Sequence, residues 1–305
     1  AISRAAKEVW KEKHHDQFPI DVFQTGSGTS SNMNANEVIA NLASKNSKLN
    51  IGPNDDVNMS QSSNDVIPTA IKISAHIDLT KKLYPALDKL INEIEKKAKS
   101  LKGITKTGRT HLMDAMPIDF SDELLAWSSQ LSACRNMLEV IEERFLELPQ
   151  GGTAVGSGIN AHKQFAKFFA QEMSKILETK RKYIPSNNFF HELSAQDCSV
   201  QLSGELKNLA VILMKISNDL RWMNSGPLAG LSEIELQALQ PGSSIMPGKV
   251  NPVIPEAVTM VSADVIGNDT SITVAAQAGN FQLNVMLPVI AYNLLKSINL
   301  LAGAM

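Results

Sequence analysis

The chain has 305 residues, of which 43% are hydrophobic and 20% charged, with 29 Lys and Arg against 31 Asp and Glu. This length suits about two domains of roughly 150 residues each, and the composition is typical of soluble globular proteins. The formal net charge is −2, which argues against nucleic acid as a partner. The unbroken apolar runs are far shorter than the roughly 20 residues of a membrane-spanning helix, so we expect no membrane partner.

The two cysteines, Cys134 and Cys198, are too few for a disulfide framework, and no CxxC pair or HExxH segment indicates a metal site. We therefore expect no metal and a reducing, cytoplasmic location, or the mitochondrial matrix if the source is eukaryotic. The chain starts at Ala1 and stops at Met305, directly after a helix-like run. We expect a fragment of a longer protein that lacks both ends.

In chain order, the first polar segment is the hydroxyl-rich loop predicted at Thr25 to Asn34, whose pattern could wrap a small anion. It lacks the dinucleotide fingerprint and the GK[ST] ending of a phosphate loop, so a nucleotide cofactor is not indicated.

The second polar segment is Ser62-Ser63-Asn64-Asp65, ahead of Pro68 and a long predicted helix. Free N–H groups and the helix dipole at such a start favour a bound carboxylate. Simple helix capping is the alternative, although it would need only one of these residues. We expect a domain boundary here, with residues 1–64 and 65–305 on its two sides.

Four segments have apolar residues three or four positions apart, which predicts amphipathic helices that pack in nearly parallel bundles. Strand-like alternation is scarce, so the sequence predicts an all-α fold with a long-helix bundle at its centre. The apolar positions are Leu83, Leu87, Leu90 and Ile94; Trp127, Leu131, Cys134, Leu138, Ile141 and Phe145; Leu202, Leu206, Leu209, Leu213, Ile216 and Leu220; and Val258, Val261 and Val265.

Two further loops are predicted between these helices. The segment Gly103 to Thr110 leads into His111, a residue type that transfers protons near neutral pH, although a surface histidine without a catalytic role is the alternative. Nearby Arg109 and Asp114 fit a structural ion pair. The glycine-rich segment Gly151 to Gly158 fits either an anion-binding nest of backbone N–H groups or a plain connector.

The richest loop is Gly242 to Pro252, with the sequence GSSIMPGKVNP, followed by Glu256 and an apolar helical pattern. Proline suits the first turn of a helix, so backbone N–H groups near Asn251 could face an anion beside the positive charge of Lys249. Ser243 could act as a base or nucleophile in such a setting. A surface turn is the alternative, because Gly, Ser and Pro are the usual turn residues.

The segment GSSIMPGKVNP resembles the signature loop of the fumarase/aspartase superfamily. Four more blocks occur in the order of that family: QTGSGTSSNMNANEV from Gln24, PNDDVNMSQSSND from Pro53, GRTHLMDAMP from Gly108 and GGTAVGSGIN from Gly151. The resemblance covers essentially the whole chain and is closest to the class II fumarase branch. It implies an all-α homotetramer with active sites shared between subunits, a central multi-helix core, and a small C-terminal domain beyond residue 305.

The resemblance also implies the reaction and the site. The reaction is reversible anti elimination of water from (S)-malate to fumarate through an aci-carboxylate intermediate, with no metal or organic cofactor. Ser243 would be the base, Lys249 and Asn251 would bind the carboxylate and stabilise the intermediate, and His111, supported by Glu256 and Thr110, would hold the water. The other substrate-binding residues implied are Ser27, Thr29, Ser62, Ser63 and Asn64.

Two alternatives stay open at this stage. The first is aspartase, which eliminates ammonia from aspartate on the same scaffold. His111 and Ser27 resemble the residues of fumarases at these positions, whereas Thr29-Ser30 and the segment 282–286 are slightly more similar to aspartases. A scaffold without activity is the other alternative, although it would have no reason to keep Ser243, Lys249, Asn251 and His111 together. Gly52 stands where bacterial fumarases often have a histidine of a secondary anion site, which leaves that site in doubt.

Overall fold

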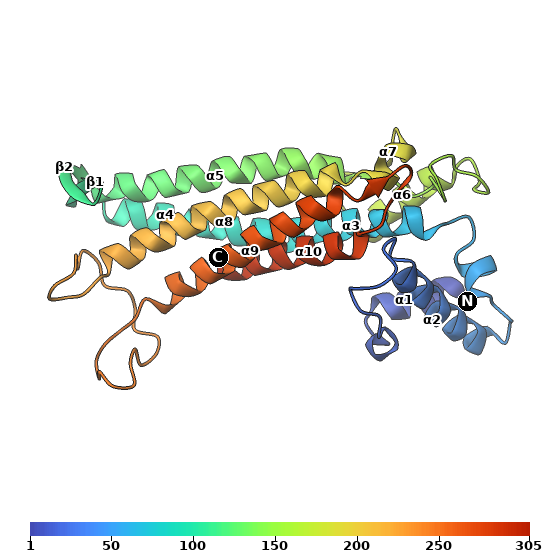
Figure 1. Cartoon of the computed structure of the whole chain (residues 1–305), viewed down its shortest axis with the longest axis horizontal. Helices are drawn as coiled ribbons and strands as arrows, with labels where there is room; N and C mark the ends of the chain where they lie inside the picture. The colour runs from blue at the N-terminus through green and yellow to red at the C-terminus, as the bar shows by residue number, and fades with distance from the viewer. The chain divides into compact units, whose positions relative to one another are not determined.

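The computed structural model describes all 305 residues and is mainly helical, with ten α-helices and three two-stranded sheets (Figure 1). The predicted helical fold class is confirmed. The chain divides into two compact units, and the long helices α3, α5, α8, α9 and α10 contribute residues to both. Each unit is described separately below.

The first unit comprises Ala1–His76, Ile141–Gln201 and Ser271–Leu295. Its helical elements are α1 (Ile2–Trp10), η1 (His15–Gln17), α2 (Thr29–Ser47), η2 (Pro53–Val57), most of α3 (Ser63–Asp78), α6 (Phe165–Ile176) and α7 (Phe189–Ser194). Its strands are β3 (Glu147–Leu148), which pairs in parallel with β4 (Ile184–Pro185), and β5 (Gly279–Asn280), which pairs antiparallel with β6 (Leu283–Asn284). Helix α3 begins beside the domain boundary predicted at residue 64, which stays a prediction.

The second unit comprises Ile77–Val140, Leu202–Thr270 and Lys296–Met305. It holds η3 (Leu79–Leu83), α4 (Tyr84–Ser100), the hairpin of β1 (Thr105–Thr110) and β2 (Met113–Asp119), and large parts of α5 (Phe120–Phe145), α8 (Asp197–Met223), α9 (Val253–Ala276) and α10 (Leu287–Ala304). Polar contacts join neighbouring helices of this bundle, namely Arg135 with Asp88, Lys207 with Asp269, and Asn268 with Ser297.

The predicted apolar positions form the buried faces of these helices. Leu131 and Leu138 of α5, and Leu202, Leu206 and Leu209 of α8, are completely inaccessible to solvent. The predicted Ile141 and Leu220, at the edges of the pattern, are half-buried. Apolar residues that repeat every 3.5 positions keep one face of a helix against its neighbours over many turns, which explains why these side chains are buried.

Helix α10 is the one helix that is long and apolar enough, by length and composition, to cross a membrane. Buried helices of globular proteins pass the same test. Five of its side chains are completely buried in the structure, namely Leu287, Ile290, Leu294, Ile298 and Leu301. These five side chains make one face of α10 part of the core.

The hairpin β1–β2 is a departure from the expected architecture, because the sequence predicted a loop over Gly103 to Thr110. The strands pair antiparallel, from Thr105 opposite Asp119 to Thr110 opposite Met113, with an irregularity at Gly108. A side chain at Gly108 would approach the Met116 carbonyl oxygen to 2.8 Å, so glycine lets the two strands come together. Figure 1 shows the hairpin at the ends of α4 and α5.

Candidate active site

The predicted site residues fall into three parts of the structure. Ser27, Thr29 and the turn Ser62–Asn64 lie in the first unit, whereas the hairpin tip with His111 and the loop from Ser243 to Glu256 lie in the second. We describe each part by itself, beginning with the first unit.

The start of α2 carries Ser27 and Thr29, whose side-chain oxygens lie 2.6 Å apart. Gly28 between them has φ +76°, a backbone conformation that glycine adopts without strain. A side chain at Gly28 would also approach Cγ1 of Ile67 in α3 to 2.8 Å. The start of α2 thus packs closely against α3. The loop was predicted to extend to Asn34, but helix α2 already begins at Thr29.

The turn Ser62–Asn64 at the start of α3 is held by neighbours on two sides. The Asn32 side chain donates a hydrogen bond to Ser63 Oγ at 2.9 Å, which connects the turn to α2. On the other side, the Asn64 side chain donates to the carbonyl oxygen of Ala154 at 2.8 Å. The structure therefore brings the five predicted binding residues of this unit to the adjacent starts of α2 and α3, where the helix dipole favours an anion.

Asp65 is a residue of this part to which sequence reasoning assigned no role of its own. It is completely buried, and its carboxylate accepts hydrogen bonds from the backbone N–H groups of Ser62, Gly151 and Thr153 at 2.9, 3.0 and 2.9 Å. Burial raises the pKa of Asp65, and the backbone hydrogen bonds offset part of that rise. The spacing Ser62-x-x-Asp65 is a capping-box pattern, which is the signal that could have singled it out.

The tip of the hairpin carries Thr110 and His111, both exposed. His111 and Leu112 have φ of +56° and +60°, so the two-residue turn has left-handed backbone at both central positions. Such a turn favours Asn-Gly, and other residues at φ above zero are strained. Strained residues of this kind concentrate at functional sites, where the surrounding structure holds them in place.

The hairpin is anchored by ion pairs along strand β1 within the second unit. Arg109 contacts a Glu233 carboxylate oxygen at 2.7 Å and approaches Asp114 at 3.9 Å. Buried Lys106 pairs with Glu123 and with Glu233, the latter at 3.4 Å. Beside these groups lies a cavity of about 580 Å³ that Trp222 and Met116 also line. The expected Arg109–Asp114 pair exists, but the shorter contact of Arg109 is to Glu233.

The loop from Gly242 to Asn251 folds back on itself. Asn251 Nδ2 donates a hydrogen bond to the Gly242 carbonyl oxygen at 2.5 Å. A side chain at Gly242 would lie 1.6 Å from the Lys249 carbonyl oxygen, so the two ends of the loop come this close only with glycine at position 242. Ser243 Oγ accepts hydrogen bonds from the N–H groups of Ile245 and Met246 at 3.3 and 3.1 Å. Two such donors stabilise negative charge on that oxygen.

A cavity of about 800 Å³ lies beside this loop, lined by Lys249, Asn251 and Glu256 together with Arg221 and Asn224 from the end of α8. Glu256 is in the first turn of α9. Ser243 is not among the residues that line the cavity. The lining thus carries two basic side chains, Lys249 and Arg221, and two acidic ones, Glu235 and Glu256.

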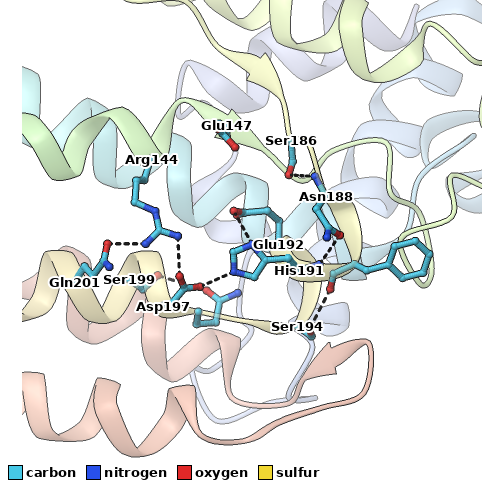
Figure 2. A network of polar contacts seen from close by, with 12 residues as sticks. Arg144, Glu147, Ser186, Asn188, His191, Glu192, Ser194, Asp197, Ser199 and Gln201 are labelled. Atoms are coloured by element: carbon cyan, nitrogen blue, oxygen red, sulfur yellow. Dashed lines mark hydrogen bonds and ion pairs between the residues drawn. The ribbon is translucent and has the colours of Figure 1, made fainter.

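A separate polar network joins the end of α5 to the start of α8 in the first unit, as Figure 2 shows. Asp197 contacts Arg144 Nη2 at 2.7 Å and His191 Nε2 at 3.1 Å. Burial opposes ionisation of Asp197, but the hydrogen bond and charge of Arg144, with His191, hold its pKa below the ordinary value. No group of three or more His, Cys, Asp or Glu side chains in the chain is arranged to hold a metal ion.

Comparisons with known proteins place this geometry among lyases. A family model described as "Lyase" matches residues 1–267. The chain is 57% identical to a class II fumarate hydratase of Pseudomonas aeruginosa, covering 99% of this chain and 66% of that protein. It is 48% identical to a class II fumarate hydratase of Bacillus subtilis, covering 100% and 67%.

A crystal structure of class II fumarase from Schistosoma mansoni superposes with a TM-score of 0.96 at 38% identity, covering 99% of this chain and 67% of that one. A structure titled fumarate lyase:delta crystallin from Brucella melitensis gives a TM-score of 0.94 at 45% identity, covering 99% and 66%. The chain thus spans about two thirds of the length of the relatives that it matches.

Proposed function

The chain belongs to the lyase family, and from this premise we propose that the whole protein is a fumarate hydratase that interconverts (S)-malate and fumarate. The observation that carries the proposal is the loop Gly242–Asn251, in which two backbone N–H groups hold Ser243 Oγ. That setting stabilises the alkoxide form of a serine base. The similarity to class II fumarate hydratases supports the same conclusion.

In the proposed mechanism, Ser243 Oγ removes a proton from C3 of (S)-malate. The C–H electron pair moves into the adjacent carboxylate and forms the aci-carboxylate, which Lys249 and Asn251 stabilise. The C2–O bond then breaks, and the hydroxyl group leaves as water with a proton from the group formed by His111, Glu256 and Thr110. Positive charge that is in place before the reaction lowers the barrier most where charge develops, which is the role we assign to Lys249.

Ser27, Thr29, Ser62, Ser63 and Asn64 supply hydroxyl, amide and N–H donors to the substrate carboxylates in this proposal. We propose a homotetramer in which each active site takes residues from several subunits, without metal or organic cofactor, in the cytoplasm or the mitochondrial matrix. The exposure of the hairpin tip, where Leu112 is 64% and Met113 70% exposed, supports a role for this tip in contacts with other subunits.

The test is conversion of malate to fumarate by the full-length protein, followed by the ultraviolet absorbance of fumarate. We expect Ser243→Ala to lower kcat by about 10²–10⁴-fold and to leave KM nearly unchanged, because a base acts in the transition state. The matched control is Ser244→Ala, since Ser244 is the exposed neighbour. Unchanged kcat in Ser243→Ala would refute the assignment of the base.

The same experiment separates the alternative reaction. Release of ammonia from aspartate, with no turnover of malate, would show an aspartase instead of a fumarate hydratase. A wild-type protein that binds fumarate and turns over neither substrate would indicate a scaffold without activity.

A further inference from the structure

The carboxylate of Asp65 connects two backbone segments of the first unit. One oxygen accepts from the Ser62 N–H, and the other accepts from the N–H groups of Gly151 and Thr153. Asp65 is completely buried, so these donors and not water satisfy its oxygens. Removing the Asp65 carboxylate would leave buried N–H groups without hydrogen-bond partners, which would lower the free energy of unfolding.

The loop that Asp65 holds has a strained backbone. Thr153 has φ +57°, which is rare for a β-branched residue, and Gly151 has φ +107°. The Thr153 hydroxyl is buried and has no hydrogen-bond partner, so its side chain does not explain this conformation. The hydrogen bond from the Thr153 N–H to Asp65 explains why the backbone of Thr153 keeps this left-handed conformation.

The same loop positions Asn64. The Asn64 side chain donates to the carbonyl oxygen of Ala154, the residue that follows Thr153. Asp65 therefore supports the turn at both ends, directly through the Ser62 N–H and indirectly through the loop that contacts Asn64. In the proposed function, Ser62 and Asn64 are two of the residues that bind a substrate carboxylate.

We propose that Asp65 is a positioning residue that sets the geometry of the carboxylate-binding turn Ser62–Asn64 by anchoring the loop Gly151–Ala154. The inference rests on the proposed function, because that function makes the turn a binding element. Asp65 is buried and does not touch the substrate in this role. Its effect is on binding of the dicarboxylate in the ground state and the transition state alike.

The test is Asp65→Asn in the full-length protein. The amide keeps the shape of the side chain but turns one acceptor oxygen into a donor that faces an N–H group. We expect KM for malate and the dissociation constant for fumarate to rise on the order of tenfold, with kcat within about threefold of wild type, because uniform binding is lost. Ser157→Ala, at an exposed position of the same loop, is the control and should match wild type.

A merely structural role for Asp65 gives a different result, with fewer active molecules, a lower Tm and an unchanged KM. That outcome would overturn the proposal. If Asp65→Asn does not fold, hydrogen exchange of the wild-type protein provides the test. Fumarate should slow exchange of the Gly151 and Thr153 N–H groups, and unchanged rates would equally overturn it.

Fumarate is the product of both reactions considered above, so its binding tests Asp65 whichever reaction the protein catalyses. Failure of the proposed function appears as absent malate turnover in the wild type. Failure of the Asp65 proposal appears as unchanged fumarate binding in the variant.

Discussion

Lys72 and Glu192 form a buried ion pair within the first unit. Both side chains are more than nine-tenths buried, and Lys72 Nζ also donates to the Glu147 carbonyl oxygen at 2.8 Å and that of Arg144 at 3.1 Å. All three Nζ donors can thus be used within one cluster. Such a group is tolerated inside a protein only when it is fully paired.

Lys72→Met should lower the free energy of unfolding by about 3–5 kcal/mol, because the buried Glu192 carboxylate would lose its lysine partner and keep only the longer contact to His191 Nδ1 at 3.6 Å. The double variant Lys72→Met with Glu192→Leu should recover most of this loss. Urea unfolding of the full-length protein measures the double-mutant cycle. Lys175→Met is the matched control, since its pair with Glu172 is exposed and contributes about 1 kcal/mol or less. Additive single effects would contradict the coupling.

Sequence reasoning assigns proposed roles to individual residues, but it does not reveal the residues that hold them in place. Ser243, Lys249 and His111 were predicted because they lie within the sequence motifs that carry the family resemblance. Asp65 and Lys72 were given no role because their importance comes from burial and from partners far away in the sequence, such as Gly151 and Glu192. No local pattern in one sequence reports which distant backbone groups will point at a side chain.

At the scale of elements, the hairpin β1–β2 shows where pattern reasoning failed. The long helices were predicted because their apolar spacing is regular over several turns, as at Leu202, Leu206 and Leu209. The hairpin has the turn His111-Leu112 where Asn-Gly would be the usual signal. Strand β1 is mostly half-buried and β2 largely exposed, and neither shows the residue-by-residue alternation of burial that marks a strand with one buried face.

Leu112→Gly should raise the free energy of unfolding by about 0.5–1 kcal/mol relative to Leu112→Ala. Both variants remove the exposed apolar side chain, but only glycine relieves the left-handed backbone at φ +60°. Thermal or urea unfolding compares the two. Equal stability of the glycine and alanine variants would show that the turn is not strained in solution.

At the scale of the whole molecule, the three parts of the proposed site must come together for activity. The proposal that active sites are shared between subunits raises a testable case, in which His111 and Ser243 of one site lie on different chains. The outward side chains Val140, Val211 and Met260, which are 63%, 52% and 68% exposed, support contacts with further copies of the chain. The sequence predicts the residues of the proposed site, which stays a prediction, whereas their assembly across chains depends on surfaces that no motif describes.

A mixing experiment tests this arrangement. Full-length Ser243→Ala and His111→Gln proteins, each nearly inactive, are unfolded in urea together at equal concentration and refolded. Random assembly should restore about one quarter of wild-type activity, because a site needs two intact contributions, each with a probability of one half. Each variant refolded alone is the control. No recovery would place His111 and Ser243 of one site on the same chain.

The close approach of Gly26 to Val285 has a consequence for the order of synthesis. A side chain at Gly26 would lie 1.8 Å from the Val285 carbonyl oxygen, and the Leu287 N–H donates to the Gly26 carbonyl oxygen at 3.1 Å. The loop beside Ser27 therefore takes its native position only after the segment from Val285 to Leu287 has left the ribosome. At about 5–20 residues per second, this delay is on the order of ten to fifty seconds, during which an early part of the proposed site lacks a contact that a later part of the chain supplies.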